Sequence, residues 1–180
     1  MTANGLLTTG FLAILLVGCS KPYEFSGRYI ATQGNDCKEV DSGDNIFITI
    51  SPESSDNADT LYSARLSSEM SGGGIFPVDS KPAYIDGDGK LSLSFYKQGK
   101  SGFFSSKPDV DMVMTLEGRD AQHIWVKNWR VNATHPKNPS LGGKFDFVND
   151  SKIEMMGRSS PNELSQLKGD DGLCLKKLTA

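Results

Sequence analysis

Short stretches in which apolar and polar residues alternate recur along most of the chain. In 45–51, for example, Ile46, Ile48 and Ile50 fall on one side of the stretch. Strict alternation is the period of a half-buried β-strand. Similar stretches cover 23–31, 60–67, 84–85, 91–95, 110–116, 124–131, 144–148 and 152–156. The pattern predicts about eight strands at short spacing, which is typical of an antiparallel barrel or sandwich.

Two short polar segments between these stretches have the composition of tight turns. The segment 86–89, Asp-Gly-Asp-Gly, predicts a hairpin turn. A calcium loop is the alternative, but such a loop needs further oxygen ligands where Lys90 and Leu91 stand. The segment 149–150, Asn-Asp, predicts a final hairpin between 144–148 and 152–156.

The sequence signals one helix clearly. The segment 160–163, Ser-Pro-Asn-Glu, has the order of a capping box with proline at the first helical position. Gly169 ends the helical pattern, and Leu164 and Leu167 are expected to face inward. The predicted fold class is therefore mainly β, an antiparallel β-barrel or β-sandwich of about eight strands with one short C-terminal helix.

Both tryptophans lie in the stretch 124–131. Trp125 and Trp129 are four residues apart, so on a regular strand they share a face with Lys127 and Val131. Core packing is the expected role of the two indole rings, and a ligand-binding box is the alternative.

Length and charge limit the class of protein. The chain has 180 residues and a formal net charge of −3. A chain of this size can bury a core of its own as one ordinary domain. The mildly acidic balance argues against nucleic-acid binding, which requires a basic surface.

The start of the chain has the pattern of an export signal. Phe11 to Val17 form an uninterrupted run of seven apolar residues, followed by Gly18 and Cys19. The run is too short to span a bilayer, which takes about 20 residues. The order Leu16-Val17-Gly18-Cys19 resembles the lipobox of bacterial lipoproteins, and a buried first helix is the alternative.

The resemblance implies how the chain is processed. A signal peptide, 1–18, would be removed, and Cys19 would carry a diacylglyceryl group and palmitate. The segment 19–22 would be a short tether, and 23–180 a single periplasmic β-domain. Ser20, in place of Asp, resembles the residue that sends lipoproteins of Gram-negative bacteria to the outer membrane. The expected location is the periplasmic face of that membrane, held by the N-terminal lipid.

With Cys19 assigned to the lipid, two cysteines remain, and they lie near the two ends of the mature domain. An exported protein meets an oxidising compartment, so Cys37 and Cys174 are expected to form a disulfide. Two unrelated buried thiols are the alternative.

Signals of catalysis are poor. The two histidines, His123 and His135, do not neighbour a nucleophile or carboxylate motif, and they leave too few ligands for a zinc site. The sequence lacks the G-x-S-x-G motif and a phosphate-binding glycine loop. We expect no enzymatic activity, no cofactor and no metal.

Binding signals are stronger. Phe103 and Phe104 lie in a Gly/Ser-rich loop, and Ile75 and Phe76 follow a glycine run. These four residues are candidates for binding a partner protein, because exposed aromatic residues often anchor partners. The alternative is that both loops fold back over an open end of the barrel.

The expected function is non-catalytic binding of another periplasmic or envelope protein, as in an envelope accessory factor or an immunity or inhibitor lipoprotein. The pattern Phe25-x-Gly27-x-Tyr29 faintly resembles the opening strand of lipocalins, with tyrosine in place of their tryptophan. It leaves open an alternative, a lipocalin-like barrel that binds a small apolar ligand. A hydrolase acting on envelope polymers is the third and least favoured hypothesis.

Overall fold

The computed structural model describes residues 22–40, 45–53, 59–68, 76–99, 107–155 and 157–179. Within these residues, ten strands form one sheet and two more form a separate hairpin. The strands of the sheet are β1 (Gly27–Ala31), β2 (Ile46–Glu53), β3 (Leu61–Ser68), β4 (Val78–Asp79), β5 (Ala83–Tyr84), β6 (Lys90–Lys97), β7 (Asp109–Asp120), β8 (His123–Thr134), β9 (Gly143–Asp146) and β12 (Leu173–Lys177). The remaining elements are β10 (Lys152–Met155), β11 (Arg158–Pro161), the 3-10 turn η1 (Pro139–Leu141) and the helix α1 (Glu163–Leu167).

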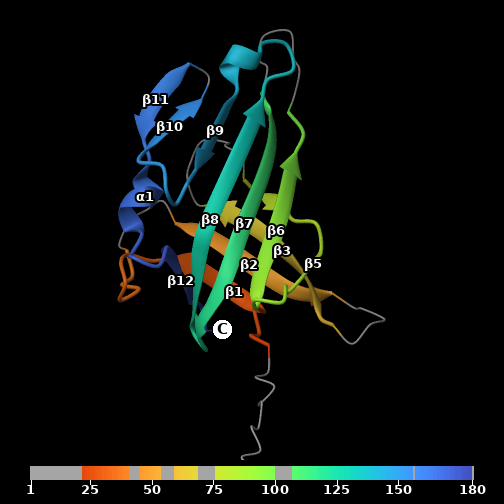
Figure 1. The fold of residues 1–180 in the computed structure, drawn as a ribbon, viewed down its shortest axis with the longest axis vertical. Coiled ribbons are helices and arrows are strands. Elements are labelled where there is room, and N and C mark those ends of the chain that lie inside the picture. Colours follow the sequence, from red (N-terminus) through yellow and green to blue (C-terminus); the bar gives the residue numbers. More distant parts are fainter. Residues whose placement is uncertain are drawn as a thin grey trace, which may run out of the picture.

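The sheet curls into a nearly closed antiparallel barrel, in the order β4-β3-β2-β1-β12-β8-β7-β6 (Figure 1). The first and last strands are neighbours, because β1 pairs with both β2 and β12. At the other edge, the Ser80 amide donates to Ala64 of β3, and Ser80 also forms a bridge with Phe95 of β6. The predicted mainly β, barrel-type fold class is therefore confirmed, with one short helix in the part of the chain that the structure describes.

The inward positions of the alternating stretches fill the barrel. Ile48 and Ile50 of β2 and Leu66 of β3 are at most 2% exposed. The inward side chains of β6 and β7 are buried to the same extent: Leu91, Leu93, Phe95, Met112, Met114 and Leu116. Burial of each such large apolar side chain stabilises the fold by about 1.5–3 kcal/mol.

The residues before β1 close one end of the barrel. Phe25 and Tyr29 are fully buried, and the Tyr29 hydroxyl donates to the Phe25 carbonyl at 3.0 Å. The Phe25 ring lies edge-on to Tyr62 of β3, with ring centroids 6.1 Å apart. Residues 23–26 are thus part of the folded domain.

A bulge in β8 places the two tryptophans on opposite faces of the sheet. Thr115 pairs with Asn128 but the next residue, Leu116, pairs with Val126, so Lys127 is an extra residue in β8. The extra residue reverses the inward and outward positions along the strand. Trp129 consequently packs in the barrel core, whereas Trp125 packs outside against Cys37 and Cys174. The prediction that both share one face is wrong, because it assumed a regular strand.

Of the two predicted hairpins, the first is confirmed. The Asp86 amide donates to the Lys90 carbonyl, and the Asp86 carboxylate accepts from the amides of Asp88 and Lys90. The second is wrong, because β9 pairs with β8, and β10 pairs with β11.

The predicted helix start is also wrong. Ser160 and Pro161 belong to β11, and Asn162 caps α1 by accepting from the Leu164 amide at 3.2 Å. Strand pairing of 158–161 with β10 therefore shortens the helix, which begins at Glu163. Leu164 and Leu167 pack against the core, as predicted.

Candidate functional site

The outward faces of β6, β7, β8 and β9 form one continuous surface. The strand register determines which residues of this surface are neighbours. Tyr96 lies opposite Asp111, Val113 opposite Arg130, and Asn132 opposite Lys144. Residues directly opposite each other in antiparallel strands have Cβ atoms about 4.5–5.5 Å apart. We call this surface the outer-face patch and define it by Tyr96, Asp111, Val113, Arg130, Asn132 and Lys144.

Two large apolar side chains are exposed in the outer-face patch. Tyr96 is 50% exposed and Val113 is 41% exposed. Both stand where the alternation of their strands would place a polar residue, and the register puts Val113 beside Ser94, two residues from Tyr96. Tyrosine and arginine are enriched in protein–protein interfaces, and Val113 adds exposed apolar surface beside Arg130.

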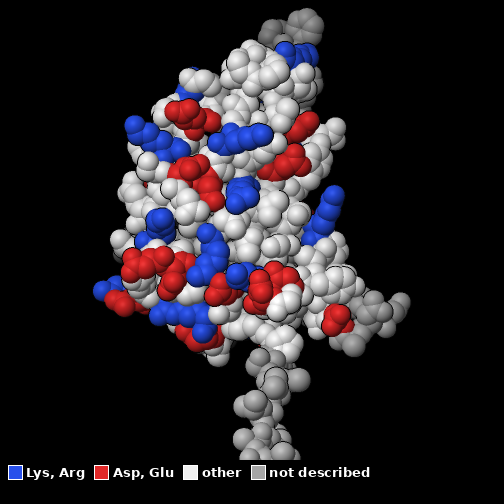
Figure 2. Space-filling model, viewed as in Figure 1, with Lys and Arg blue, Asp and Glu red and all other residues white. Residues whose placement is uncertain are grey.

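A groove of about 450 Å³ runs along the outer-face patch. Its lining residues are Asp111, Val113, Arg130, Val131, Asn132, Lys144, Phe145, Asp146 and Asp150. Figure 2, viewed from the side of β6, β7 and β8, shows acidic and basic side chains interspersed on this face. The surface therefore has mixed charge, which suits polar recognition.

The charged groups of this groove differ in whether they interact with other described residues of the chain. Asp146 accepts from the amides of Val148 and Asn149, and Asp150 accepts from the Asp146 amide at 2.6 Å. The carboxylates of Asp146 and Asp150 therefore accept hydrogen bonds within the turn after β9. Arg130 and Lys144, by contrast, form no ion pair with the described residues of the chain.

The core among the described residues encloses one small cavity next to a tryptophan. A cavity of about 10 Å³ lies among residues of β1, β2, β3, β7, β8 and β12, including Trp129. A single water molecule needs about 10–15 Å³ on this measure. The Trp129 indole N–H is buried and has no hydrogen-bond partner among the residues that the structure describes.

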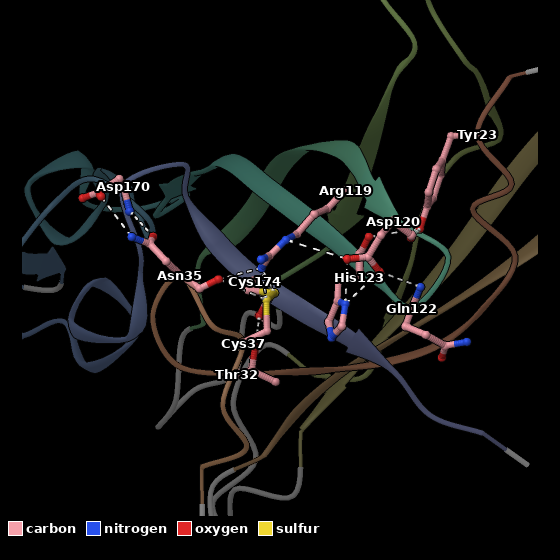
Figure 3. The surroundings of a disulfide bond; sticks show 10 residues. All are labelled: Tyr23, Thr32, Asn35, Cys37, Arg119, Asp120, Gln122, His123, Asp170 and Cys174. Atoms are coloured by element: carbon pink, nitrogen blue, oxygen red, sulfur yellow. Dashed lines mark hydrogen bonds and ion pairs between the residues drawn. A yellow bond between two sulfur atoms is a disulfide. The ribbon is translucent and has the colours of Figure 1, made fainter. Parts of the chain in front are cut away.

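The predicted disulfide between Cys37 and Cys174 is present, on the outside of the barrel (Figure 3). Arg119 covers it by donating to the Asn35 carbonyl at 2.7 Å and to the Cys37 sulfur at 2.6 Å. The guanidinium group also lies 4.9 Å from the centroid of the Trp125 ring, within cation–π distance. The bridge is therefore shielded: Cys37 is 5% exposed and Cys174 is fully buried.

The turn between β7 and β8 is held by a second polar cluster, also drawn in Figure 3. Asp120 accepts from the Gln122 amide at 2.9 Å and lies 2.8 Å from His123 Nδ1. The Tyr23 hydroxyl donates to the Asp120 carbonyl at 2.6 Å. Desolvation alone would raise the pKa of the Asp120 carboxyl, but the hydrogen bonds from Gln122 and His123 together hold it below its usual value.

The two histidines do not share a cleft. His123 begins β8, whereas His135 follows its other end, and the His135 ring accepts from the amides of Lys137 and Asn138. The geometry that the hydrolase hypothesis requires, both histidines meeting a carboxylate or serine, is therefore not formed. Among the described residues, no cluster of three metal-ligating side chains occurs.

Of the residues predicted to act in anchoring or binding, Cys19, Ile75, Phe103 and Phe104 lie outside the described residues. Phe76 is half-buried and packs against the core, with its ring 6.3 Å from Trp129. The Phe76 side chain is therefore directed toward the barrel core. Within the described ranges, no helix is long and apolar enough to cross a membrane.

Sequence reasoning missed Tyr96, Val113 and Arg130. A signal was present, because Tyr96 and Val113 are large apolar residues in the polar phase of their strands. Their proximity depends on the pairing of β6, β7 and β8, which the alternation does not specify.

Comparison with protein-family models, with curated proteins and with solved structures finds no match for this chain.

Proposed function

We propose that this protein is a lipoprotein of the outer membrane whose periplasmic β-domain binds another envelope protein without catalysis. The observation that carries the binding role is the outer-face patch, in which Tyr96 and Val113 are exposed beside an Arg130 that forms no ion pair with the described residues. Lipidation of Cys19 is supported by the lipobox-like sequence alone. An envelope accessory factor and an immunity or inhibitor protein both fit this outline.

Tyr96 and Arg130 are the proposed anchors of the interface. Interface residues of these types often contribute most of the binding energy, whereas the polar residues around them exclude water. Replacing either by alanine is expected to weaken binding by about 1.4–2 kcal/mol, or roughly 10- to 30-fold. The free energy of unfolding should change by less than about 0.5 kcal/mol, because both side chains are at the surface.

Site-specific cross-linking in the native envelope tests the proposal. A photoreactive residue in place of Val113 should give one discrete cross-linked protein, and Tyr96→Ala in the same chain should strongly reduce its yield. The matched control is the same residue in place of Ser51, which is exposed on β2. Equal cross-linking from both positions, or none from Val113, would contradict the proposal.

A second candidate function, a barrel that binds a small apolar ligand, is favoured by the buried indole N–H of Trp129, which finds no hydrogen-bond partner within the described ranges. A bound ligand with a hydrogen-bond acceptor would satisfy this group. Quenching of tryptophan fluorescence by lipid-like ligands, lost in Trp129→Phe, would support this function. Unchanged fluorescence across a broad panel would count against it.

A further inference from the structure

The chain enters the barrel through a tyrosine that is fixed to the β7–β8 turn. The Tyr23 hydroxyl contacts the carbonyl oxygens of both Asp120, at 2.6 Å, and His123, at 3.1 Å. The ring lies against Gly118, where an added Cβ would come within 2.2 Å of the ring. Tyr23 thus occupies a site that matches it in shape and in hydrogen bonding.

Both sides of this contact are rigid. Next to Tyr23, Phe25 is fully buried, and the two rings meet edge-on with centroids 4.8 Å apart. On the other side, Asp120 holds the turn through the Gln122 amide and the His123 ring. The domain is therefore fixed to its own start from Tyr23 onward.

We propose that Tyr23 sets the orientation of the domain on a lipid headgroup surface. In this orientation the β7–β8 turn faces the membrane, and the outer-face patch lies away from it. The inference rests on the proposed lipidation of Cys19. It adds the orientation of the domain and the kind of partner that can reach the patch.

Distances support this orientation. Tyr23 is four positions after Cys19, and an extended chain of four residues spans at most about 14 Å. Along β7, Asp120 in the turn is nine positions after Asp111 in the patch, which corresponds to about 30 Å of strand. Figure 1 shows the β7–β8 turn and the start of β1 at one end of the barrel, and η1 and β9 toward the other.

Charge also disfavours a domain that lies flat. The chain has a net charge of −3, so its sides gain no general attraction to an anionic headgroup surface. A short tether at one end then leaves the opposite end in water. The partner of the outer-face patch is accordingly a water-soluble protein or an extramembrane domain, and not a membrane-embedded segment.

The test measures how near each end lies to the headgroups. Full-length lipidated protein is reconstituted into vesicles of phosphatidylethanolamine and phosphatidylglycerol that contain a headgroup-linked quencher. A fluorescent dye is attached to Gln122→Cys in the turn or to Val113→Cys in the patch, both exposed positions. The Gln122→Cys dye should be quenched several-fold more than the Val113→Cys dye.

Variants of Tyr23 test whether its contact with the β7–β8 turn sets the orientation of the domain. Tyr23→Phe removes the hydroxyl and keeps the ring, and Tyr23→Ala removes both, so the difference in quenching should fall in that order. Tyr84→Ala, which replaces an exposed tyrosine on β5, is the control and should leave the difference unchanged. Tryptophan fluorescence of each variant reports whether the barrel remains folded, and Tyr23→Phe serves if Tyr23→Ala does not fold.

The outcomes separate the two proposals. Failure of the protein to float with the vesicles would overturn the lipid anchor, and with it the proposed orientation. Flotation with equal quenching at both positions would overturn the proposed orientation alone. So would a difference in quenching that survives in both Tyr23→Phe and Tyr23→Ala.

Discussion

Reduction of the disulfide is predicted to lower the free energy of unfolding substantially. Cys37 and Cys174 are 137 residues apart, so their bridge closes a loop that covers most of the domain. In the chain-entropy model, a loop of that length stabilises the folded state by about 5 kcal/mol, because it restricts the unfolded chain. The folded state should change little, since β1 and β12 are paired and Thr32 donates to the Cys174 carbonyl through both its amide and its hydroxyl.

Urea unfolding followed by tryptophan fluorescence measures this effect. Wild-type protein is compared with and without reductant, which removes the cross-link and leaves both sulfur atoms in place. With a slope of about 2 kcal/mol per molar urea, the midpoint should fall by roughly 2–3 M. The free energy of unfolding of the double variant Cys37→Ala/Cys174→Ala should lie within about 1–2 kcal/mol of that of the reduced protein. The variant should be the less stable of the two, because it also loses the packing of the two sulfur atoms. A loss below about 2 kcal/mol would refute the reasoning, because the bridge would then act only locally.

Two further predictions concern single side chains. Asn162 is 1% exposed, and its amide donates to two backbone carbonyls while its oxygen caps α1, so Asn162→Ala should lower the free energy of unfolding by about 2–4 kcal/mol in a urea titration. A loss below about 1 kcal/mol in Asn162→Ala would contradict the role given to these three hydrogen bonds. Asp120 has a pKa held below its ordinary value of 3.8, so its contribution to stability should be present above that value and be lost as the pH falls through the folded-state pKa. In His123→Ala the pKa of Asp120, measured by NMR, should rise, and an unchanged pKa would contradict the role given to the His123 ring.

The barrel was predictable because its information is local. Alternation in single strands, such as Ile46, Ile48 and Ile50, depends only on which face meets the core. The disulfide was predictable because, once the resemblance to a lipobox assigns Cys19 to a lipid, the other two cysteines have one possible pairing.

The errors arose where pairing between strands decides the local structure. Lys127 is an extra residue only relative to β7, and the bulge moves Trp125 to the outside, where it covers the disulfide. Ser160 and Asn162 are both good helix caps, and the choice between them follows from the pairing of β11 with β10. The outer-face patch was missed for the same reason, because Tyr96 and Arg130 are brought onto one surface only by the register of three strands.

Native mass spectrometry of the protein extracted gently from its own membranes tests the membrane anchor and the binding role together. The spectrum should show a chain that begins at a lipidated Cys19 and retains one bound protein. In Tyr96→Ala and Arg130→Ala the lipid mass should remain and the bound protein should be lost. An unlipidated chain that still carries residues 1–18 would contradict the membrane anchor. A bound small molecule in place of a protein, unaffected by these two variants, would contradict the binding role of the outer-face patch.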